Sequence, residues 1–211
     1  MQQRRTNPER AEATRTALLQ AGRSLFVQKG YAETSTPEIA IAAKVTRGAL
    51  YHHFTDKRDL FRAVLEREAQ AVAGVIEAAG SPNLAPREAL LKGSIAYLDA
   101  MSVPGRTRLL LIDGPAVLGH SEIAALDRVH AERTLREGLE AAAGSSRPPF
   151  SLAAMTALLS AAFDRAALAI EAGSDPTEFR LAMTSLIERV MADEGAGLQA
   201  IVQNSSNAKR S

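Results

Sequence analysis

The sequence predicts an all-α protein of about nine helices, with a small N-terminal three-helix domain followed by a larger helical domain. Ala, Leu, Glu and Arg, which all favour helices, dominate the 211 residues. Runs of β-branched residues bounded by turn residues are nearly absent. Apolar residues recur at helical spacing, and Ser, Thr, Asp, Gly and Pro stand where such helices would begin and end.

The first helix is predicted over Glu9–Lys29, where apolar residues form one stripe and Gly30 is placed to end the helix. A second, short helix is expected to end near Ala43. Ser35 and Glu38 fit a capping box at its start. Alternatively, Thr36 caps this helix and Pro37 occupies its first turn.

A third short helix is predicted to follow Thr46, a good N-cap, and to close at His53 or Phe54. Thr55 is then expected to cap a longer fourth helix. Loops are predicted at 80–86 and 144–149, where Gly, Ser, Pro and Asn gather. The later helices are expected at Pro86–Met101, Arg106–Ile112, Ser121–Ala143, Leu152–Ala172 and Pro176–Ala192.

Composition is that of an ordinary globular chain, with 46% hydrophobic and 23% charged residues. The absence of Cys excludes disulfides and thiolate metal sites and favours a reducing compartment. The arginines near the start precede no apolar stretch, so no secretory signal is expected. No apolar run approaches the roughly 20 residues that a membrane helix needs. We therefore expect a cytoplasmic protein without a membrane partner.

Charge is distributed unevenly along the chain. Residues 1–70 hold 12 Lys and Arg against 8 Asp and Glu, whereas residues 71–194 hold 11 against 16. The last 17 residues, 195–211, add two positive charges and complete the net charge of +1. A basic head on an acidic body points to a polyanionic partner for the head.

The segment from Ile39 to Phe54 reads IAIAAKVTRGALYHHF, two helices too short to bury a face alone. Their apolar residues are expected to pack against each other and the first helix. Arg47 and Tyr51 are four residues apart, as are Gly48 and His52, so all four share one solvent-facing side. Such a face suits a helix that reads the major groove, with donors, flat polar groups and a small residue for close approach.

Two residues at the ends of these helices are candidates for phosphate contacts. Thr46 can offer its hydroxyl at the start of the third helix. Lys57, in the first turn of the fourth, can hold a phosphate from the other side. A plain three-helix packing module with surface Arg, Tyr and His is the alternative reading of this segment.

Three motifs resemble the TetR family of bacterial transcription regulators: LFVQKGYAETS at Leu25–Ser35, the segment above, and DKRDLF at Asp56–Phe61. The sequence departs from the family at Lys44, where the turn usually has Gly, and at Pro37, where a polar or basic residue is common. The resemblance implies a homodimeric regulator of double-stranded DNA with a pseudo-palindromic operator. Together with the pattern above, it predicts DNA contacts from Ser35, Thr36, Thr46, Arg47, Gly48, Tyr51, His52 and Lys57.

The larger domain is expected to dimerise and to bind a small-molecule effector that releases the operator. The last two helices carry more apolar surface than one partner can cover, which predicts a four-helix interface. The interface residues are expected to be Leu152, Met155, Leu159, Phe163, Phe179, Met183, Leu186 and Val190.

Polar or sulfur-bearing groups among apolar neighbours mark candidate ligand contacts, namely Tyr97, Met101, Asp113, His120 and His130. Functional domains are predicted at 1–55 and 56–194, with a C-terminal tail at 195–211.

Other chemistry finds little support. The stretch RLLLIDGPAVLGHS at Arg108–Ser121 resembles a phosphate loop, but His120 stands in place of its Lys; a short helix, a Gly-Pro break and a further helix are expected instead. The histidines do not cluster as metal ligands, and no catalytic motif is present, so we expect no metal, no cofactor and no enzyme.

Asp164 and Arg165 interrupt an apolar helix either as a local pair or as an interface or pocket contact. A helical protein-interaction module without DNA binding remains the alternative function.

Overall fold

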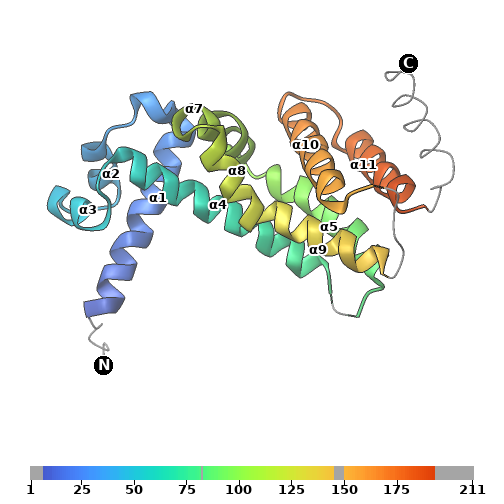
Figure 1. Cartoon of the computed structure of the whole chain (residues 1–211). Helices are drawn as coiled ribbons and strands as arrows, with labels where there is room; N and C mark the ends of the chain where they lie inside the picture. Colours follow the sequence, from blue (N-terminus) through green and yellow to red (C-terminus); the bar gives the residue numbers. More distant parts are fainter. Residues whose placement is uncertain (1–6, 82, 145–149, 193–211) are drawn as a thin grey trace, which may run out of the picture. The chain divides into compact units, whose positions relative to one another are not determined.

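The computed structural model describes residues 7–81, 83–144 and 150–192. These residues form eleven α-helices and one π-helical segment and contain no β-strand, which confirms the predicted all-α class (Figure 1). The predicted tail at 195–211 and residues 145–149 of the second predicted loop lie outside the described residues. The helices in chain order are α1 (Asn7–Glu33), α2 (Thr36–Ala42), α3 (Arg47–His53), α4 (Lys57–Ala79), α5 (Pro86–Met101), α6 (Arg106–Arg108), α7 (Gly114–Leu118), α8 (His120–Val129), α9 (Ala131–Ala143), α10 (Leu152–Glu171) and α11 (Pro176–Met191).

The chain divides into two compact units that differ from the domain boundary predicted after residue 55. The first unit combines residues 1–71 with residues 103–127, and the second combines 72–102 with 128–211. Helix α4 therefore contributes to both units, as does α8. Residues 103–127 belong to the first unit because they pack against α1 and α4. A Cβ on Gly105 would lie 2.6 Å from Val27 of α1, and Arg106 pairs with Glu68 of α4 at 2.9 Å. The functional boundary after residue 55 stays a prediction.

In the first unit, α1 and α4 enclose an aromatic core. The Phe26 and Phe61 rings meet edge to face at 4.9 Å, and both side chains are fully buried. The approach of the two helices is close, because a Cβ on Gly22 would lie 2.6 Å from Cδ2 of Leu60. Ile39 of α2 and Leu50 of α3 are also fully buried, so the short helices complete this core as expected.

The predicted helix starts are confirmed at α2 and α3 and wrong at α4. Ser35 and Glu38 form the capping box of α2, and Thr46 caps α3 by accepting a hydrogen bond from the Ala49 amide. At α4 the Asp59 amide donates to the Asp56 side chain, not to Thr55. Thr55 instead donates to the Asp59 carboxylate from both its amide and its hydroxyl. Asp56 is therefore the cap, because its carboxylate reaches the amide three residues ahead.

Two predicted helices after residue 103 are divided differently. No break occurs at Gly114–Pro115, because the chain passes from α6 through a π-helical segment (Leu109–Asp113) straight into α7. Pro115 has no amide proton to donate within the helix, a condition that favours such local rearrangement. The predicted helix 121–143 is broken at His130, where φ is −120° and ψ is −101°. These divisions raise the count above the expected nine.

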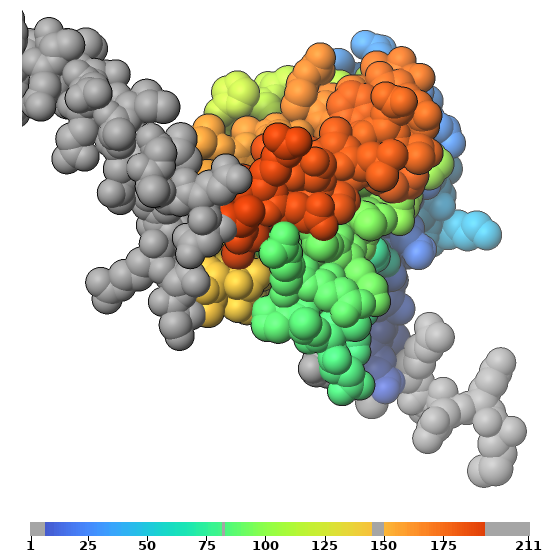
Figure 2. Space-filling model, turned by 90° about the vertical axis from the view of Figure 1, so that its right-hand side faces the viewer, coloured from blue at the N-terminus to red at the C-terminus, as the bar shows by residue number. Residues whose placement is uncertain are grey.

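In the second unit, α5 packs against α9, α10 and α11, and α10 also packs against α9 and α11. The end of α4 lies beside α5, because a Cβ on Gly93 would come within 3.2 Å of Ile76. Figure 2 shows α10 and α11 side by side, coloured orange to red. Part of the predicted dimer interface is wrong: Leu159, Phe163 and Met183 are buried within the protomer. Leu186 is exposed, whereas Leu152, Met155, Phe179 and Val190 are half-buried.

The most exposed leucines of α10 and α11 were not among the predicted interface residues. They are Leu158 and Leu181, with 67% and 68% of their surface accessible. By length and composition α10 could cross a membrane, contrary to the expectation that no such run exists; 28% of its apolar window is buried inside the protein. This outward apolar surface is the feature that a partner would cover.

Candidate nucleic-acid interface

The turn between α2 and α3 places α3 across α2. The Lys44 amide donates to the Ile41 carbonyl and the Val45 amide to the Ala40 carbonyl, each at 3.0 Å. Lys44 adopts a φ of 57°, and it is the one positive-φ residue other than glycine among those described. The turn therefore keeps its left-handed conformation although a lysine occupies the position.

Replacing Lys44 with Gly is expected to stabilise the protein by about 1 kcal/mol, because glycine lacks the Cβ that disfavours this conformation. Urea unfolding of the full chain would measure the gain. Lys44→Ala keeps a Cβ, so it should show no comparable gain. Equal stability of Lys44→Gly and the unmodified protein would show that the turn carries no such strain.

The outward face predicted for α3 is present. Thr46, Arg47, Gly48, Tyr51 and His52 are all exposed. The Arg47 guanidinium lies over the Tyr51 ring, 5.6 Å from its centroid. The exposed face therefore combines a cation, a phenol and an imidazole on one short helix.

Tyr51 is held by α2 as well as by its own helix. Its hydroxyl lies 3.1 Å from Oγ1 of Thr36. This hydrogen bond, followed by the interaction with Arg47, lowers the pKa of Tyr51 from its ordinary value of 10.0. A more acidic phenol is a better hydrogen-bond donor, which suits contact with an acceptor such as a phosphate oxygen.

Among the residues that the structure describes, none packs closely against Gly48. A Cβ built there would have only Oγ1 of Thr46 within 4 Å, at 3.9 Å. Glycine inside a helix costs about 0.5–1 kcal/mol relative to alanine. Because no described neighbour of Gly48 requires its small size, we interpret this glycine as allowing an external surface to approach α3 closely.

Lys57 is held by contacts within the protein. Its ammonium donates to the carbonyl oxygens of Tyr31, at 2.8 Å, and Thr34, at 2.9 Å, with Ala32 at 3.4 Å. It also lies 4.2 Å from the centroid of the Tyr31 ring. An ammonium has three protons, and these carbonyls use them. Lys57 therefore fixes the end of α1 to the start of α4, and its contact with a phosphate stays a prediction.

The remaining predicted contacts gather at the ends of α2 and α3. The Ser35 hydroxyl donates to Glu38 at 2.8 Å, so its proton is engaged in the capping box. Thr46 uses an oxygen lone pair to cap α3, which leaves its hydroxyl proton free to donate. Thr36 shares its hydrogen bond with Tyr51. Contact of these residues with DNA stays a prediction.

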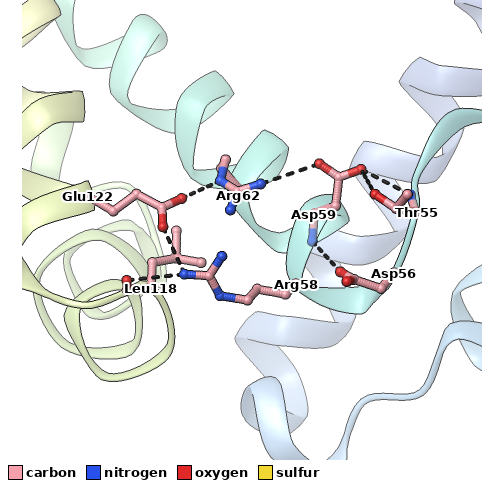
Figure 3. A network of polar contacts seen from close by, with 7 residues as sticks. All are labelled: Thr55, Asp56, Arg58, Asp59, Arg62, Leu118 and Glu122. Carbon is pink, nitrogen blue, oxygen red and sulfur yellow. Dashed lines mark hydrogen bonds and ion pairs between the residues drawn. The ribbon is translucent and has the colours of Figure 1, made fainter.

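A network that the sequence reading missed joins the start of α4 to α7 and α8 (Figure 3). Glu122 accepts from Arg58 at 2.8 Å and also pairs with Arg62. Arg58 donates to the Leu118 carbonyl at 3.2 Å, and Arg62 lies 3.5 Å from Asp59. Two arginines four residues apart on α4 were the available signal. We call Arg58, Arg62 and Glu122 the α4–α8 brace.

The predicted ligand contacts are not brought together. Asp113 and His120 belong to the first unit, whereas Tyr97, Met101 and His130 belong to the second. Only Tyr97 lines the cavity of the second unit, which is bounded by α4, α5, α9 and α10. Met101 is core, 2% exposed, and His130 stands at the break before α9. Sequence spacing does not show which polar groups share a cavity, because the helices that enclose it come from distant segments.

Comparison with known proteins covers both parts of the chain. Residues 18–64 match the family described as bacterial regulatory proteins, tetR family, and residues 87–193 match the tetracyclin repressor-like C-terminal domain. The chain is 47% identical over 64 residues to the HTH-type transcriptional repressor BepR of Brucella suis, and 48% identical over 62 residues to the HTH-type transcriptional regulator AcrR of Shigella flexneri. These alignments cover 30% and 29% of this chain and the same shares of the two relatives.

The likeness extends to solved structures over most of the chain. A TetR-family transcriptional regulator from Pectobacterium atrosepticum superposes with a TM-score of 0.66 at 27% identity, covering 88% of this chain and 95% of that one. A TetR-family regulator from Streptomyces coelicolor has the same fold, with a TM-score of 0.68 at 22% identity, covering 90% and 96%. With its C-terminal match extending over half of the sequence, the chain belongs to the TetR family of bacterial regulatory proteins.

Proposed function

We propose that this protein is a transcription regulator that binds double-stranded DNA through α3, acts as a homodimer in the cytoplasm, and is released from its operator by a small molecule. The exposed face of α3 carries the proposal. Arg47 presents the planar donors that pair with guanine in the major groove. Gly48 allows the backbone to come close, and Thr46 and Tyr51 supply donors for phosphate. The name of the Brucella relative, a transcriptional repressor, supports repression.

Arg47→Ala is expected to reduce the preference for operator over random DNA by roughly tenfold, because one bidentate base contact discriminates by about 1–3 kcal/mol. Competition in a gel-shift assay, using promoter DNA from the neighbourhood of the protein's own gene, measures this ratio. Arg67→Ala is the charge-matched control, since Arg67 is exposed on α4 beyond the helix-turn-helix. Equal losses on both DNAs would demote Arg47 to a phosphate contact. A protein that binds neither DNA would favour the interaction-module alternative.

The homodimer is supported by the outward apolar surface of α10 and α11. Leu158, Leu181 and Leu186 lie exposed on these helices, beside many alanines. Two copies that meet through both helices would bury this surface in a four-helix interface. Two recognition helices related by a two-fold axis would then match a pseudo-palindromic operator.

Release by a ligand is supported by the path of α4. Its first turn joins the α4–α8 brace, directly after α3, and its last turns contribute Ile76 and Glu77 to the cavity of the second unit. A ligand that favours a different position of α4 would change the spacing of the two recognition helices. A coupling of about 1–3 kcal/mol weakens operator binding by about 5–150-fold. The coupling is reciprocal, so excess operator should weaken binding of a releasing compound by the same factor.

Glu122→Ala is expected to lower operator affinity by up to about fivefold, because the partly exposed brace contributes roughly 1 kcal/mol or less to the position of α4. Fluorescence anisotropy would give the affinity, and hydrogen exchange should be faster in residues 55–62. Glu88→Ala, which breaks the Lys92 pair within α5, is the control and should change neither. Unchanged exchange and affinity in Glu122→Ala would show that the brace does not position the recognition helix.

A further inference from the structure

The cavity of the second unit has a volume of about 280 Å³ and a mainly apolar wall. This volume lies just below the range of about 300–1,000 Å³ that small-molecule sites span, so a small ligand is expected. We propose that the cavity selects a small lipophilic cation, an apolar skeleton that carries a protonated amine. The inference rests on the proposed function only in taking this ligand to be the releasing effector.

An aromatic pair supplies the wall for the apolar part of the ligand. The rings of Tyr97 on α5 and Phe163 on α10 lie 5.3 Å apart at 62°. The Tyr97 hydroxyl donates to Asp164 at 2.6 Å. Donating this hydrogen bond to a carboxylate increases the electron density on the phenol oxygen and ring of Tyr97. An electron-rich ring attracts a cation.

The hydroxyl groups in the wall offer acceptors. Ser94 donates its proton to the Leu90 carbonyl and Thr134 to the Ala131 carbonyl, each at 2.8 Å. Tyr97 spends its proton on Asp164. A hydroxyl has one proton and two lone pairs, so Ser94 and Thr134 can accept from a ligand without losing these bonds. They favour a ligand that donates hydrogen bonds.

The charge of the lining is negative. Glu77 and Glu137 are the charged residues among the described lining residues, and about half of each side chain is exposed. Both pair with the same guanidinium, that of Arg133, at 2.5 and 3.1 Å. One positive charge faces two carboxylates, which leaves one negative charge at the cavity. A ligand with an amine compensates this charge, whereas a carboxylate ligand is repelled by it.

Three probes with one phenylbutyl skeleton test the inference: phenylbutylamine, phenylbutanol and phenylbutyrate. Calorimetry on the full chain, without DNA and at low salt, should rank the amine first and the carboxylate last. The amine is expected to bind about tenfold tighter than the carboxylate, the scale of exposed charge interactions. Ala89→Phe fills the cavity from α5 and should abolish binding of all three while circular dichroism confirms the fold.

Charge variants make the test specific. Glu137→Gln should reduce the preference for the amine, and Glu77→Gln with Glu137→Gln should reverse it, because Arg133 then remains as an unpaired cation. Phenylbutanol binding should stay unchanged in both. Glu140→Gln is the control, since Glu140 lies on the same helix, pairs with Arg136 and does not line the cavity.

The outcomes separate this inference from the proposed function. Carboxylate binding as tight as amine binding, no binding of any probe, or an unchanged preference in the double variant would overturn it. Amine binding that leaves operator affinity unaltered would support the cavity chemistry and contradict only its coupling to DNA. Operator binding by a protein that fails to bind the amine would contradict the cavity inference alone.

Discussion

Replacing Leu158 and Leu181 together with Glu is expected to give a folded monomer whose operator affinity is at least about a hundredfold lower. Both side chains are two-thirds exposed in the protomer, so the charges should not disturb its core. In a dimer they would place four carboxylates in an apolar interface. Loss of the second recognition helix removes an avidity gain of about 10²–10⁴.

Sedimentation velocity at micromolar concentration gives the oligomeric state, and anisotropy gives the operator affinity. Val129→Glu is the matched control, because Val129 is also exposed but lies on α8. It should remain dimeric. A double variant that stays dimeric would place the interface elsewhere. Substitution of Phe163 would be uninformative, since that side chain is buried in the protomer.

Glu68→Ala is expected to destabilise the protein by about 3 kcal/mol, as removal of one member of a buried ion network does. The Glu68 carboxylate accepts from Arg23 at 2.9 and 3.1 Å and from Arg106 at 2.9 Å, and its side chain is 8% exposed. Without it, both guanidinium groups lose the Glu68 carboxylate as an acceptor. Because Arg23 is 28% exposed, water can partly replace the lost carboxylate at its guanidinium. The expected loss of stability is therefore no larger than about 3 kcal/mol.

The same network should give an acid-sensitive contribution to stability. Burial raises the pKa of Glu68, but the hydrogen bonds from Arg23 and Arg106 outweigh burial, and the net pKa is lowered from 4.5. A carboxyl whose pKa is lowered on folding stabilises the protein above its unfolded pKa. That contribution is lost as the pH falls through the lower, folded value.

Urea unfolding at neutral pH and at pH values below about 4 would test both statements. The stability deficit of Glu68→Ala should shrink as the pH falls. Glu66→Ala is the control on the same helix, because Glu66 is exposed. Equal stability of Glu68→Ala and the control at neutral pH would contradict the role of the network.

The helix-turn-helix could be predicted from sequence because its signals are local. Ser35 and Glu38, or Thr46 and the Ala49 amide, lie three residues apart, and their chemistry fixes a helix start wherever they occur. The outward face of α3 follows from four-residue spacing on a single helix. The cap of α4 was predicted one residue too early, at Thr55 and not Asp56, because adjacent polar residues can cap a helix in the same way.

Long-range pairing could not be predicted in this way. Arg106 reaches Glu68 across 38 residues of sequence, and Glu122 reaches Arg58 across 64, so the attachment of residues 103–127 to the first unit has no local signal. Alanines of α10 lie on all of its faces, so the apolar periodicity of this helix does not show that Phe163 is buried and Leu158 exposed. For the same reason the sequence could not show that only Tyr97 among the predicted ligand contacts lines this cavity, since residues from four helices form its wall.

In the proposed function, α3 reads a two-fold symmetric DNA sequence as part of a dimer. Selection of binding sites from a pool of randomised duplex DNA, with the full-length protein at moderate salt, tests it most directly. We expect enrichment of one pseudo-palindrome, whose half-sites are separated by about one helical turn or a multiple of it, with affinity that falls steeply as salt rises. A pool that shows no enriched sequence, or binding that is indifferent to sequence and salt, would contradict the proposed function.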